Sequence, residues 1–143
     1  TSRGDDALGP LFIERLREEL RARDDIDFLD DYQLMPEHAL DLAGRARVLF
    51  VDASASCAAP FEVQAVARAA DASFSSHALS PQALLQAYRE VHGAEPPPAT
   101  LLAIRGQRFT LGTPMSNCAL ANLDAALTWA ARWLPQPALD TTT

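Results

Sequence analysis

The stretch RVLFVDA, residues 47–53, decides the fold expected for this chain. It is a continuous apolar run that ends in an acid, without the alternation of apolar and polar residues that marks a half-exposed strand. Such a run is typical of a strand buried on both faces of a parallel sheet. Asp52 is therefore expected at the carboxyl end of a buried strand in an α/β protein.

Amphipathic helices are predicted on both sides of this strand. Apolar residues spaced by three and four positions indicate a first helix of about 13 residues that starts near Pro10. Residues 80–93 repeat the pattern, with a serine at the expected cap and Val91 among the inward-facing side chains. Further helices are expected at 35–44 and 116–134.

Strand patterns alternate with these helices, at 26–34, 61–67 and 100–104. This order predicts a three-layer α/β fold, with a mostly parallel, twisted sheet flanked by helices. The chain has 143 residues, of which 48% are hydrophobic. We therefore expect a single domain over residues 1–143 with one sizeable core.

Composition argues against several classes of partner. The net charge of −7 disfavours nucleic acid and anionic membrane surfaces. No apolar run approaches the roughly 18 residues of a membrane span, and no signal-peptide pattern is present, so we expect a soluble, cytoplasmic monomer without a membrane partner. Cys57 and Cys118 are too few for a disulfide framework and too far apart for a zinc pair, and both are expected to be buried.

Polar residues are predicted at the rim where the strands end, which is where α/β proteins bind ligands. Asp5 and Asp6 precede the first helix, Asp52 ends its strand, and His77 precedes the helix at 80–93. One acid of the pair, together with Asp52 and His77, supplies two carboxylates and one imidazole, which is an incomplete ligand set for a transition metal with positions open to water or to a partner's ligands. Each also has an ordinary interpretation, as a helix cap, a turn acceptor or a solvated histidine.

Motifs of self-contained hydrolases are missing from the sequence. It contains no H-E-x-x-H, G-x-S-x-G, G-x-x-x-x-G-K-[ST] or C-x-x-C. Asp5 and Asp6 cannot form an aspartic-protease dyad by themselves, because that dyad needs two carboxylates facing each other across a cleft. His38 and His92 lie in helical segments beside charged residues, and neither is expected to bind a metal.

Three segments together resemble the maturation endopeptidases of nickel-iron hydrogenases. They are SRGDDALGPLFIERL (2–16), VLFVDA (48–53) and SSHALSPQALL (75–85). The family pattern has an acidic pair in a G-N-x-x-x-x-D-[DE]-x-x-G turn, an acid ending a buried strand, and a histidine followed by a helix. The likeness covers nearly the whole chain, and 32–53 looks most like the branch serving NAD-linked bidirectional hydrogenases.

The resemblance implies an endopeptidase that removes a C-terminal extension from the hydrogenase large-subunit precursor after nickel insertion. Carried over by position, the nickel-contacting residues are Asp6, Asp52 and His77. Asp5 and Glu37 are further candidates for a secondary site or a substrate contact. The nickel would be supplied by the substrate and would serve as the recognition element. These residues do not indicate the group that activates the attacking water, because a metal-polarised water and a carboxylate base both fit.

The sequence departs from the family pattern in two places. Family members carry a first strand that ends in a G-x-G-N turn, and this sequence begins inside that motif at Thr1. That first strand is therefore expected to be missing from this sequence. Ala7 stands where a glycine commonly follows the acidic pair, which affects the turn but removes no ligand.

Two other functions remain open. A phosphoacceptor receiver domain also has an acidic pair, an aspartate that ends a strand and a small hydroxyl, for which Ser75 or Ser76 could stand. It needs a lysine after its last strand, and all 12 basic residues here are arginine, with Arg105 a poor substitute. The other function is an inactive scaffold that docks on hydrogenase assembly factors.

Overall fold

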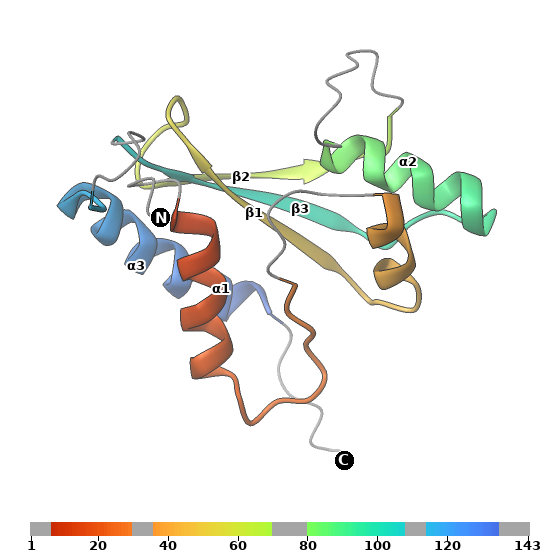
Figure 1. The fold of residues 1–143 in the computed structure, drawn as a ribbon, viewed down its shortest axis with the longest axis horizontal. Helices are drawn as coiled ribbons and strands as arrows, with labels where there is room; N and C mark the ends of the chain where they lie inside the picture. Colours follow the sequence, from red (N-terminus) through yellow and green to blue (C-terminus); the bar gives the residue numbers. More distant parts are fainter. Residues whose placement is uncertain (1–6, 30–35, 70–79, 108–113, 135–143) are drawn as a thin grey trace. The chain divides into compact units, whose positions relative to one another are not determined.

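The structure is a computed structural model that describes residues 7–29, 36–69, 80–107 and 114–134. Helices and strands alternate along the chain, as the sequence predicts (Figure 1). In chain order they are α1 (Leu8–Glu19), the 3₁₀ helix η2 (Pro36–Leu42), β1 (Val48–Ser54), β2 (Phe61–Val66), α2 (Pro81–His92), β3 (Ala99–Arg105) and α3 (Asn117–Trp133). None of the helices in these ranges is long and apolar enough to cross a membrane.

The described strands form one sheet in the order β1-β3-β2. The N–H of Val48 donates to the carbonyl of Pro98 at 2.9 Å, which joins the starts of β1 and β3 and makes them parallel. The N–H of Arg105 donates to the carbonyl of Pro60 at 3.1 Å, which joins the end of β3 to the start of β2 and makes that pair antiparallel. The predicted α/β class is confirmed, with a mixed sheet flanked by helices.

The residues divide into two compact units, and α1 and α3 pack together in the first of them. Helix α1 buries Leu8, Phe12 and Leu16, spaced by four residues, and α3 buries Leu123 and Leu127 with the same spacing. Helices are predicted at both positions. Unit 1 comprises Thr1–Asp30, Asp52–Glu62 and Ala103–Thr143.

Unit 2 has its own apolar core, in which α2 packs on η2. Ser80 caps α2 by accepting the N–H of Ala83 at 3.0 Å, and Gly93 ends it with φ +67°. The unit comprises Asp31–Val51 and Val63–Leu102. Its core is formed by Ala39, Leu42, Phe50, Val66, Leu84, Leu85, Tyr88 and Ala99, with Val48 and Leu101 against it.

Three local expectations are wrong. Val91 is 67% exposed, because the apolar stripe continues past the part of α2 that is covered. β1 is not buried on both faces, because Phe50 is its one buried residue and Asp52 is exposed. Residues 26–29 form no strand, and the rest of the predicted strand at 26–34 lies outside the described residues.

Candidate functional site

Asp52 is the predicted metal-contacting residue that the structure describes. It lies in β1, two positions before the last residue of that strand, and its side chain is exposed. The N–H of Ala53 donates to Asp52 Oδ1 at 2.9 Å, which holds the carboxylate beside its own backbone. Asp5, Asp6 and His77 lie outside the described residues, so the predicted three-residue set stays a prediction.

Glu37, the other predicted acid within the described ranges, is in the first turn of η2 and is exposed. It belongs to unit 2, whereas Asp52 belongs to unit 1. Among the described residues no three His, Cys, Asp or Glu side chains form a group that could hold a metal ion. Asp52 alone offers one carboxylate, so a metal at this position needs ligands from elsewhere.

The connection that follows Asp52, residues 54–60, is held by hydrogen bonds of the Ser54 and Cys57 side chains. Ser54 Oγ accepts the N–H of Ser56 at 3.2 Å and that of Cys57 at 3.0 Å. The Cys57 thiol is buried and donates to the carbonyl of Ala103 in β3 at 3.5 Å. These contacts tie the chain after Asp52 to the end of β3.

Arg105, the last residue of β3, holds the same connection. Its Nη1 donates to the carbonyl of Cys57 at 2.6 Å and its Nε to the carbonyl of Gly106 at 3.2 Å. Asn122 Nδ2 in α3 donates to the carbonyl of Arg105 at 2.9 Å. Because the guanidinium is committed to backbone carbonyls, it does not replace the free ammonium that a receiver domain needs, which counts against that alternative.

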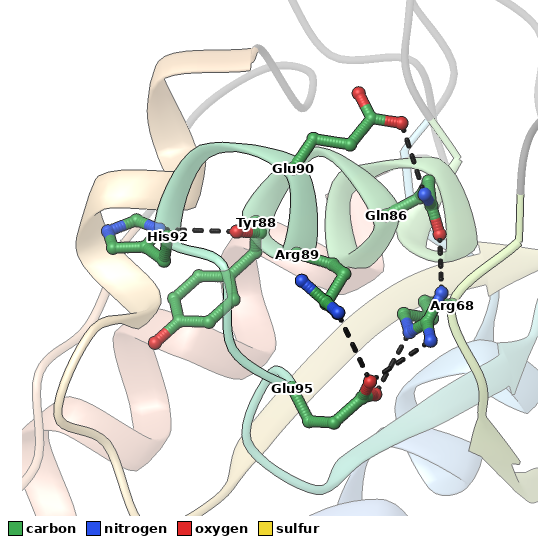
Figure 2. Close-up of polar contacts among 7 residues, drawn as sticks. All are labelled: Arg68, Gln86, Tyr88, Arg89, Glu90, His92 and Glu95. Atoms are coloured by element: carbon green, nitrogen blue, oxygen red, sulfur yellow. Dashed lines mark hydrogen bonds and ion pairs between the residues drawn. The ribbon is translucent and has the colours of Figure 1, made fainter.

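The two histidines expected not to bind metal lie in unit 2. His38 is 7% exposed, in η2. His92 stacks on Tyr88 with ring centroids 4.2 Å apart, and its Nδ1 lies 3.3 Å from the carbonyl of Tyr88 (Figure 2). Both cysteines are predicted to be buried. The prediction is confirmed for Cys57 and wrong for Cys118, which is exposed.

A polar cluster on α2 was not foreseen from the sequence (Figure 2). Arg68, two residues after β2, binds Glu95 through Nε and Nη2 at 2.9 and 3.0 Å and Gln86 through Nη1 at 3.0 Å. Arg89 Nε lies 3.3 Å from the same Glu95 carboxylate. The hydrogen bond with Arg68 lowers the pKa of Glu95 and raises the pKa of Arg68.

A shallow groove of about 510 Å³ lies between α1 and α3 in unit 1. None of the predicted site residues lines it, so its position gives no support to a catalytic role. It is lined by Glu19, Asp124, Leu127, Thr128, Ala131 and Arg132.

No protein-family model matches the chain, and no curated protein matches its sequence. Its fold does match solved structures. The [NiFe] hydrogenase maturation protease HycI from Thermococcus kodakarensis KOD1 is 22% identical, with a TM-score of 0.66 over 91% of this chain and 83% of that one. For the hydrogenase maturating endopeptidase HybD from E. coli the identity is 20% and the TM-score 0.67, over 92% and 84%.

A third structure is the hydrogenase 2 maturation peptidase from a Thaumarchaeota archaeon. It is 18% identical with a TM-score of 0.64, over 94% of this chain and 92% of that one. At these identities the likeness concerns the fold, and it agrees with the resemblance found in the sequence segments. The chain has the fold of the hydrogenase maturation endopeptidases.

Proposed function

We propose that this protein is an endopeptidase that removes the C-terminal extension of a nickel-iron hydrogenase large-subunit precursor. The shared fold supports the proposal, because the compared structures are named as maturation endopeptidases. The sequence supports it independently, since the acidic pair, the strand-ending acid and the histidine before a helix occur in the family's order. The observation that carries it is the exposed Asp52 near the carboxyl end of β1.

In this proposal the nickel of the substrate is the recognition element. Asp6, Asp52 and His77 contact it, while thiolates of the large subunit hold it, so an incomplete ligand set is suited to the task. Cleavage then depends on a filled hydrogenase active site. Asp5 and Glu37 would lie at the edge of the substrate contact. The protein would act as a monomer in the cytoplasm, where the precursor is assembled.

The deciding experiment uses the full-length protein with nickel-loaded precursor, nickel-free precursor and a peptide of the C-terminal extension. We expect cleavage, followed by mass spectrometry, of the nickel-loaded precursor alone. Asp52→Ala should abolish this cleavage and leave the circular dichroism spectrum unchanged, because the side chain is exposed.

Asp124→Ala is the matched control, since Asp124 is an exposed acid of the same unit whose ion pair is with Arg15 at 3.4 Å. It should cleave like the wild type. Efficient cleavage of the nickel-free peptide would contradict nickel recognition. Full activity of Asp52→Ala would remove this residue from the site.

A further inference from the structure

Strand β2 has an outer edge, on the side away from β3. Among the described strands it pairs with β3 and stands last in the order β1-β3-β2. Four successive residues, from Glu62 to Ala65, are exposed, and Val63 is 40% exposed. Successive residues of a strand point to opposite faces of the sheet, so neither face of β2 is covered over this stretch.

The register of the antiparallel β2–β3 pair determines which backbone groups point outward. The N–H of Arg105 donates to the carbonyl of Pro60, so these two residues lie opposite each other as a hydrogen-bonded pair. The same register sets the last residue of β2 opposite the first residue of β3, in agreement with the bounds of both strands. Because hydrogen-bonded positions alternate, the N–H and C=O groups of Val63 and Ala65 point away from β3, at a spacing of about 6.8 Å.

The edge lacks the features with which proteins commonly block an edge strand, namely charged side chains and proline. Residues 63–66 read VQAV, and the charged side chains on either side of them are engaged elsewhere. Glu62 Oε2 accepts the N–H of Ala58 at 3.0 Å. Arg68 binds the carboxylate of Glu95. A chain that approaches this edge therefore meets uncharged side chains.

The start of β2 lies at the same end of the sheet as the end of β1. The N–H of Gly106 donates to the carbonyl of Ser54 at 2.9 Å, and that of Arg105 to the carbonyl of Pro60 at 3.1 Å. All four residues belong to unit 1, as does Asp52. A strand added along β2 therefore begins or ends at the end of the sheet where the proposed nickel contact lies.

From these observations we infer that the C-terminal extension of the large-subunit precursor binds as an added β-strand along the outer edge of β2, an inference that rests on the proposed function. Outward N–H and C=O groups at every second residue complement an extended polypeptide, and such main-chain hydrogen bonds give affinity in strand addition. Holding the segment extended also positions it for cleavage. The segment that fits this edge is uncharged, rich in β-branched or other apolar residues, and without proline at a pairing position.

A proline substitution tests the inference, because it removes one outward donor. Ala65→Pro deletes the N–H that points away from β3 and leaves the hydrogen bonds to β3, since proline is tolerated in edge strands at such positions. We expect the apparent KM of the full-length protein for nickel-loaded precursor to rise about five- to tenfold. Ala65→Thr keeps the N–H and is the matched control, which should process the precursor like the wild type.

Val63→Lys is a second variant, and it serves if the proline variant folds poorly. It places a charge on the edge at an exposed position, so circular dichroism should be unchanged while the apparent KM rises.

Hydrogen exchange gives an independent measurement. In the free protein the amides of Glu62 and Gln64, which face β3, should exchange slowly, and those of Val63 and Ala65 should exchange fast. In the complex with saturating nickel-free precursor, exchange at Val63 and Ala65 should slow by at least about tenfold. This alternation is specific to pairing along the edge.

The outcomes separate this inference from the proposed function. If the wild type processes no form of the precursor, the proposed function fails and the inference fails with it. If the wild type processes the precursor and both Ala65→Pro and Val63→Lys have its apparent KM, the inference alone fails. Slow exchange at Val63 and Ala65 in the free protein would overturn it, because the edge would already be paired. A dimer in sedimentation that Ala65→Pro converts to a monomer would assign the edge to a second copy and also overturn it.

Discussion

At the scale of single residues, the exposed ion pair between Arg68 and Glu95 can be tested independently of the proposed function. Two nitrogens of Arg68 bind the Glu95 carboxylate, and the pKa of Glu95 is lowered mainly by that hydrogen bond. A lowered pKa in the folded state stabilises the fold above the unfolded-state pKa of about 4.3. This contribution is lost as the pH falls through the folded-state value.

We expect an NMR titration of the Glu95 carboxyl to show a lowered pKa that moves up toward the ordinary value in Arg68→Ala. Arg89→Ala should move it less, because Arg89 makes one longer contact of 3.3 Å. Arg68 is exposed, Arg89 is half-buried, and both pair with an exposed carboxylate, so the free energy of unfolding should change little. A Glu95 pKa that is unaffected by Arg68→Ala would contradict the bidentate contact.

The residues of the candidate site were only partly predictable. Asp52 could be placed because a strand-ending acid is a local pattern, and the structure has it near the end of β1, while its contact with a metal stays a prediction. Arg105 was noted at its strand end, but its carbonyl partner lies 48 residues away, and no local pattern reveals a pairing of that kind. The pairing of Arg68 with Glu95, outside the candidate site, was unpredictable for the same reason, since the two residues are 27 positions apart.

At the scale of elements, the cap of α2 gives a prediction on stability. Ser80 Oγ accepts the N–H of Ala83, so Ser80→Ala should cost about 1 kcal/mol of unfolding free energy in chemical denaturation. Ser56→Ala is the matched control, because the hydroxyl of Ser56 makes no hydrogen bond within the described residues. Equal stability of Ser80→Ala and wild type would show that the cap contributes nothing.

Helices and strands could be predicted where the local sequence determines them. The capping serine predicted for α2 and the spacing of apolar residues located α2 and α3 to within a residue or two. The direction of β2 was not predictable, because it depends on pairing with β3, which follows about forty residues later in the chain. The predicted burial of Val91 is wrong because the spacing of apolar residues identifies one face of a helix. It does not tell how far along that face neighbouring elements cover the helix.

At the scale of the whole molecule, the two compact units raise the question of cooperativity. Three of their boundaries fall inside a strand, after Val51, Glu62 and Leu102. Each of the three described strands thus has residues in both units, and we expect the two units to unfold together. If the chain is a single domain, as predicted, it should unfold in one cooperative transition.

Leu123→Ala in unit 1 and Leu84→Ala in unit 2 test this expectation. Both leucines are buried, at 0% and 1% exposed, and each substitution should cost about 2–5 kcal/mol. In denaturant, each should shift the same single transition, followed by circular dichroism and by tryptophan fluorescence. Leu40→Ala, at a position 63% exposed, should shift it little. Two transitions, each sensitive to one variant, would mean that the units unfold separately.

The two cysteines differ in accessibility, and this has a practical consequence. Cys118 in the first turn of α3 is exposed, while the thiol of Cys57 is buried against a carbonyl. Thiol-directed dyes react with accessible thiolates, so a maleimide fluorophore should attach to the native chain at Cys118. The unaltered sequence thus offers a single labelling position, from which fluorescence anisotropy can follow docking of a large partner in real time.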